Sequence, residues 1–141
     1  MEYDFEKLAK EIVVAKLKDV ADPAAVAGEV VHKIAVSALK GTQARQEPRV
    51  TISAACRGVM SGMVLIEKDL PGTAVALIAQ MALIAQESNL DPAECMTWAM
   101  EGIAPVVMVA PAGTSDAVGE AIEERFMGAR EAFLNILKAS A

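Results

Sequence analysis

The sequence predicts an all-α protein, a compact bundle of five to six helices around a buried central helix, in one domain that spans residues 1–141. Two observations support this fold class. Hydrophobic residues make up 54% of the chain, yet only 4% of residues are aromatic and 27 of the 141 are alanine, and such small apolar side chains favour closely packed helices. In addition, apolar residues recur with a helical period, and good N-cap residues precede three of these runs.

The amino-terminal third is predicted to form two helices. Tyr3 to Val20 places its apolar residues on one arc and most of its charges opposite, which is typical of an amphipathic surface helix. Asp22 and Pro23 then supply an N-cap and a favoured first helical residue. The second helix is expected to end at Lys40, with Gly41 as its stop.

The next segment is ambiguous at its start. Gly41 to Pro48 is polar and predicts a loop. Val50 to Ser53 alternates like a strand, but we predict a helix from Arg49 to Asp69. Small residues at every fourth position, including Gly58 and Gly62, leave one face of this helix open to a close neighbour.

The central helix is predicted at Thr73 to Glu87, which is apolar on nearly every face, as a buried helix is. Asp91, followed by proline and a glutamate at the third helical position, gives the clearest helix start in the chain. Pro105 predicts that this next helix is kinked or broken nearby, and Val106 to Val109 is β-branched enough to form a strand.

The last helix is predicted to run from about Asp116 to Ala139, where the helical period is strongest. Its start is expected at the Thr114 and Ser115 pair, which can act as an N-cap. A loop followed by a helix also resembles the entry to a phosphate site. The segment lacks the lysine and the glycine spacing of known phosphate loops, so capping is preferred.

The distribution of charged and apolar residues excludes several classes of function. The chain carries a formal charge of −6, and residues 69–124 contain no lysine or arginine, so we expect no nucleic-acid binding, which depends on cations that neutralise phosphates. The first 20 residues lack a continuous apolar stretch, so we expect a cytoplasmic protein. The longest apolar run, Thr73 to Ala85, is shorter than a spanning helix requires, so we expect no membrane span.

One spacing suggests a metal site. Glu29 and His32 lie three residues apart on the second predicted helix, and this spacing turns both side chains the same way, as in carboxylate-bridged di-iron bundles. His32 is the only histidine, so other carboxylates, from Glu67, Glu87 or Glu101, would have to complete such a site. In the competing interpretation, both residues lie on the solvent-exposed polar stripe of this helix and bind no metal.

A second hypothesis concerns an apolar or amphipathic small molecule. Arg57 is the single charged residue between Arg49 and Glu67. It is expected either to pair with an acidic residue of the cation-free block or to bind the anionic end of a ligand. Flexible methionines can line an adaptable apolar cavity, whose candidate residues are Met60, Met63, Met81, Met100 and Trp98. Core filling is the alternative for these methionines.

The preferred function is non-catalytic association, as a homo-oligomer or adaptor, because the chain has excess apolar content and no evident catalytic set. The small-molecule binder and a carboxylate-rich metal enzyme are the alternatives, and no cofactor is expected. Cys56 and Cys95 are separate and form no metal-binding pair, so both are predicted to be buried, reduced thiols. The second predicted helix, the helix segment from Ala54 to Ile66 and the helix from Thr73 to Glu87 must be covered by neighbours on most faces. Only the first and last predicted helices are clearly amphipathic and can cover them, so we expect at least a dimer.

Overall fold

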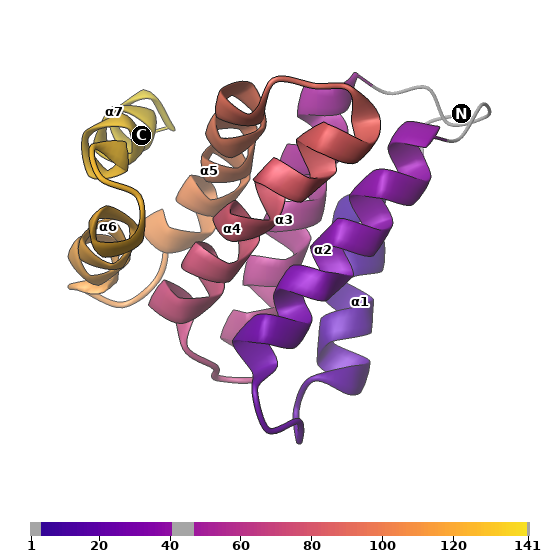
Figure 1. The fold of residues 1–141 in the computed structure, drawn as a ribbon. Coiled ribbons are helices and arrows are strands. Elements are labelled where there is room, and N and C mark those ends of the chain that lie inside the picture. The colour runs from indigo at the N-terminus through magenta and orange to yellow at the C-terminus, as the bar shows by residue number, and fades with distance from the viewer. Residues whose placement is uncertain (1–3, 41–46, 141) are drawn as a thin grey trace.

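Seven helices form the part of the chain that the computed structural model describes, residues 4–40 and 47–140, and no strand occurs there (Figure 1). The all-α prediction is confirmed, and the predicted count of five to six helices is wrong. The helices are α1 (Phe5–Lys16), α2 (Pro23–Lys40), α3 (Pro48–Leu65), α4 (Leu70–Ser88), α5 (Pro92–Met108), α6 (Thr114–Arg125) and α7 (Ala129–Ser140).

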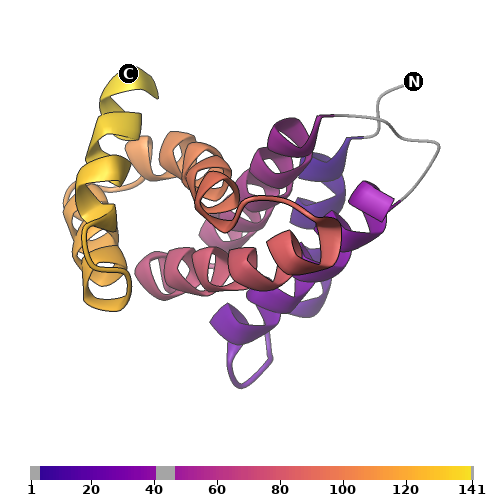
Figure 2. The same cartoon turned by 45° about the horizontal axis from the view of Figure 1, so that its top comes forward.

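Helices two places apart along the chain pack side by side, which gives the bundle two layers. One layer holds α1, α3 and α5, and the other holds α2 and α4, which pass in front in Figure 1. The pair α6 and α7 packs against α4 and α5, at the end of the bundle opposite α1 and α2 (Figure 2). The prediction of one central helix needs correction, because α3 buries nine residues and α4 seven.

Close approach within the first layer depends on glycine. A Cβ at Gly58 would collide with the backbone oxygen of Glu6, and one at Gly62 would lie 2.8 Å from the Val13 side chain. The predicted small face of α3 is therefore confirmed, and α1 is the helix that packs on it. Since the contacts advance together along both helices, α1 and α3 run in parallel.

Aspartate side chains begin most of these helices. Asp91 accepts a hydrogen bond of 2.9 Å from the Ala93 N–H, and Asp22 accepts one of 3.3 Å from Ala25. These two predicted starts are confirmed. Asp69, which was expected to end a helix, instead begins α4 by accepting from the Gly72 N–H at 3.2 Å. The sequence Leu70-Pro71-Gly72 is therefore a helix start, since proline is favoured in the first turn.

Of the kink or break predicted near Pro105, the break is wrong, because α5 continues through Pro105 to Met108, and the kink stays a prediction. Proline removes one hydrogen bond, the bond to the carbonyl group of Glu101. The residues beyond it are held by burial, since Val106 is 7% exposed and Val107 1%. Of the strand-like run, Val106 to Met108 is helical, and Val109 is the C-cap of the same helix. The strand-like alternation of Val50 to Ser53 also lies within a helix, α3.

The predicted single helix from Asp116 to Ala139 is also wrong, because it is divided into α6 and α7. The chain turns at Gly128, whose φ is 88°, a conformation that glycine adopts without steric cost. Glu123 holds the turn by accepting hydrogen bonds from the N–H groups of Gly128 at 3.0 Å and Arg130 at 3.2 Å. The turn brings α7 back against α5, where Phe133 is fully buried.

The start of α6 differs from the prediction too. Gly113 is the N-cap residue, and it makes no side-chain hydrogen bond to the first turn. The expected cap at Thr114 and Ser115 is therefore wrong, since Thr114 is already the first residue of the helix.

By length and composition alone, α4 is long and apolar enough to cross a membrane. It packs in the bundle against α2, α3, α5 and α6, and a buried core helix has the same composition. The expectation of no membrane span stays a prediction.

Candidate functional site

Large apolar side chains are exposed where α3 and α5 end. Leu65 is 60% exposed and Val109 is 85% exposed, and Val64 and Met108 beside them are also exposed. We call these four residues the α3–α5 face. Single exposed apolar residues are ordinary, but a cluster on one face marks an interaction surface.

A groove of about 380 Å³ runs along this face between α1, α3 and α5. Its polar lining consists of Arg57 and Ser61 of α3 together with Glu6 and Lys10 of α1. Its apolar wall consists of Val64, Leu65, Pro105, Val106, Val109 and Ala110. We call this hollow the α1–α3–α5 groove.

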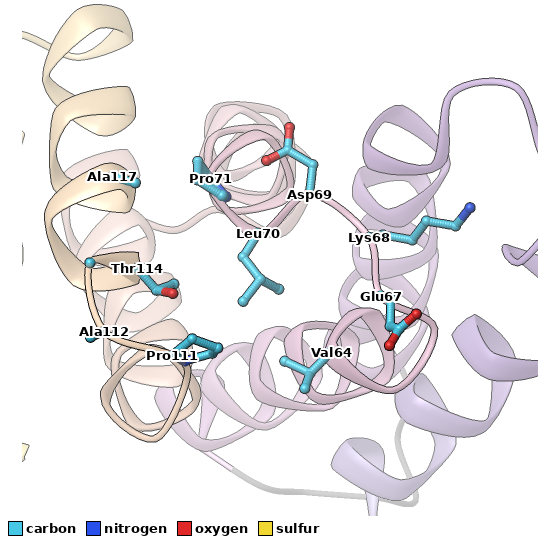
Figure 3. Close-up of a pocket in the computed structure, with 11 residues that line it drawn as sticks. Val64, Glu67, Lys68, Asp69, Leu70, Pro71, Pro111, Ala112, Thr114 and Ala117 are labelled. Atoms are coloured by element: carbon cyan, nitrogen blue, oxygen red, sulfur yellow. The ribbon is translucent and has the colours of Figure 1, made fainter.

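Val64 also lines a second hollow, of about 700 Å³ (Figure 3). It is formed by the α3–α4 connection and by the segment from Pro111 into the first turn of α6. Leu70 projects into it, and Glu67, Lys68 and Asp69 stand at its edge (Figure 3). The connection is tight, because Glu67 adopts a φ of 56°, which is uncommon for a residue with a side chain.

Arg57 has a different partner from the one expected. Its Nε lies 3.8 Å from a carboxylate oxygen of Glu6, on α1, so the predicted pairing with an acidic residue of the 69–124 block is wrong. The contact is long for a hydrogen bond, and the Arg57 side chain is 51% exposed. No other ion pair of Arg57 is found among the described residues.

The candidate methionines lie in the core. Met60, Met63 and Met81 are fully buried and Met100 is 3% exposed. None of them lines either hollow beside Val64, and neither does Trp98, which is half-buried against the core. Neither of these two hollows therefore brings Arg57 together with these five residues.

The metal candidates form an ion pair instead of a cluster. The His32 Nε2 of α2 lies 2.6 Å from a carboxylate oxygen of Glu87 at the end of α4. Glu29 lies elsewhere, in a hollow of about 310 Å³ between α1 and α2 that Lys33 also lines. Within residues 4–40 and 47–140, no group of three or more metal-binding side chains occurs, so these residues do not form the carboxylate-rich centre.

Arg49 of α3 is bound to Glu101 of α5. Two hydrogen bonds, of 2.9 and 2.7 Å, join the guanidinium to the two carboxylate oxygens. The hydrogen bonds and charge of Glu101 raise the pKa of Arg49 above its ordinary value. From the sequence, Arg49 was predicted to begin a helix and Glu101 was a possible metal ligand, and their pairing was not predicted. This pair ties the start of α3 to the middle of α5.

Both cysteines are fully buried. Burial raises the pKa of the Cys56 thiol to about 12, and burial together with the charges of Asp91 and Glu94 raises the pKa of Cys95. The thiolate is the reactive form, so burial keeps both thiols in the unreactive protonated form at pH 8.

We therefore expect neither cysteine to react with a maleimide within minutes at pH 8 in the native protein, and both to react after unfolding in guanidinium. Mass spectrometry of the labelled chain counts the added groups. Labelling of native Cys56 at the rate of the unfolded chain would contradict the burial of this thiol.

Comparison with protein-family models, with curated protein sequences and with solved structures found no match.

Proposed function

We propose that this chain is a non-catalytic, cytoplasmic protein that acts through association, and that the α3–α5 face binds a second copy of the chain. The observation that carries the proposal is the exposure of four large apolar side chains at one end of two neighbouring helices. The fully buried part of a protein interface is apolar, and exposed Leu65 and Val109 supply that part.

The shape of this surface supports docking. Val64 lines both the α1–α3–α5 groove and the hollow of Figure 3. Apolar side chains of a partner can enter such hollows, and anchors that fill pockets contribute most of the binding energy in protein interfaces.

The charges around the face favour a second copy as the partner. The two hollows carry three cations and three anions at their edges, namely Lys10, Arg57 and Lys68 with Glu6, Glu67 and Asp69. A two-fold axis brings the same surface of both protomers together. An edge with both signs of charge can then pair with its own copy, whereas an edge of one sign would repel it.

A charge placed in the face tests the proposal. Leu65→Asp is expected to weaken the dimer at least about 100-fold, because a carboxylate buried in an apolar interface without a partner costs several kcal/mol. Size-exclusion chromatography at micromolar concentration measures the change. Circular dichroism checks that the variant remains folded.

Leu83→Asp is the matched control. Leu83 is 50% exposed on α4 and lines neither hollow. We expect wild type and Leu83→Asp to elute together as dimers and Leu65→Asp to elute later as a monomer. Equal elution of all three proteins would refute docking through this face.

A further inference from the structure

The polar lining of the α1–α3–α5 groove carries an excess of positive charge, although the whole chain is acidic. Lys10 and Arg57 outnumber Glu6 among its charged residues, while the chain has a net charge of −6. In the described part of the chain, Lys10 has no ion pair, and Arg57 has the long contact to Glu6 alone. Both cations are therefore open to an anion in the groove.

Polarity changes along the groove in step with α3. Arg57, Ser61 and Val64 follow one another by about one turn each and all line the groove. From Arg57 to Leu65 the helix advances about 12 Å. Along α3 the lining thus passes from the N–H and O–H donors of Arg57 and Ser61 to the apolar Val64 and Leu65, and Pro105, Val106 and Val109 supply an aliphatic wall from the α5 side.

We propose that the α1–α3–α5 groove binds an amphipathic anion, a fatty carboxylate, with its carboxylate at Arg57 and Lys10 and its acyl chain along the aliphatic wall. A guanidinium binds a carboxylate through two parallel hydrogen bonds, and the Arg57 contact to Glu6 involves Nε at 3.8 Å. The groove volume of about 380 Å³ falls within the range of about 300–1,000 Å³ usual for small-molecule sites.

This inference does not depend on the proposed dimer, because ligand binding is measured directly. The two are linked by Leu65 and Val109, which belong both to the groove wall and to the α3–α5 face. A bound acyl chain and a second protomer would cover the same side chains, so we expect them to compete.

Isothermal titration calorimetry with sodium decanoate, below its micelle concentration, tests the site. We expect one decanoate bound per chain. Arg57→Gln is expected to weaken binding about tenfold or more, since a hydrogen bond to a charged group contributes about 1.5–3 kcal/mol. Glu6→Gln is expected to strengthen binding, because among the described residues that line the groove it removes the one carboxylate.

Two controls distinguish binding at this site from nonspecific binding of amphiphiles to the protein. Lys16→Gln removes a cation of α1 outside the groove and is expected to leave the decanoate affinity unchanged. Decyltrimethylammonium has a similar chain with a positive head group and is expected not to bind. The titration is made at a dilution at which light scattering shows a monomer, so that a second protomer does not cover the groove. The proposal is overturned if wild type then gives no heat of binding with decanoate, if Arg57→Gln binds it as wild type does, or if the cationic amphiphile binds equally well.

Discussion

The Gly102→Ala variant is expected to lose about 2 kcal/mol or more of its free energy of unfolding. A Cβ at Gly102 of α5 would collide with the backbone oxygen of Ser53 in α3. A backbone cannot rotate away as a side chain can, so α3 and α5 must move apart, and overpacking of this kind costs about 1–3 kcal/mol and sometimes more. Urea unfolding followed by circular dichroism measures the loss.

Gly119→Ala is the matched control, because Gly119 also lies buried within a helix. Its added Cβ would meet the Arg130 side chain at 3.5 Å, an ordinary contact. Alanine is favoured over glycine in a helix interior by about 1 kcal/mol, so this variant is expected to gain stability. An unchanged Gly102→Ala protein would mean that α3 and α5 are not in close contact at Ser53.

The Phe133→Ala variant is expected to lose about 3–5 kcal/mol of its free energy of unfolding, as other buried aromatic side chains do on truncation. Phe133 is the one fully buried residue of α7, and this side chain anchors α7 on the bundle. The variant is therefore also expected to expose the α7 backbone to hydrogen exchange.

Met127→Ala serves as the control for this truncation. Met127 lies in the turn before α7 and is 95% exposed, so its removal is expected to change stability by less than about 0.5 kcal/mol. A small effect of Phe133→Ala would contradict the burial of this side chain against α5.

Local chemistry explains which parts of the fold the sequence predicts. An aspartate followed by proline begins a helix through contacts within one turn, so the starts of α2 and α5 follow from adjacent residues. The division of α6 from α7 depends on Glu123 reaching across the turn to Gly128 and Arg130. The apolar period continues through this turn, so periodicity alone predicts one helix.

The candidate site shows a second reason why prediction from the sequence fails. Arg57 is conspicuous among small and apolar neighbours, but its partner Glu6 lies on α1, and sequence spacing does not reveal which helices are adjacent. The methionines were open to two interpretations because a flexible thioether suits a core and a cavity equally well. The exposure of Leu65 and Val109 depends on where α3 and α5 end; α3 was predicted to reach Asp69 but ends at Leu65, and no end of α5 was predicted.

The mass of the wild-type protein in solution is the most direct test of association through the α3–α5 face. Light scattering coupled to size exclusion, at micromolar concentration and low ionic strength, measures it without a label or a variant. The proposed dimer predicts twice the chain mass of 14.8 kDa, about 29.6 kDa. A mass of 14.8 kDa would show that the chain remains a monomer with Leu65 and Val109 in water, and would contradict the proposed function.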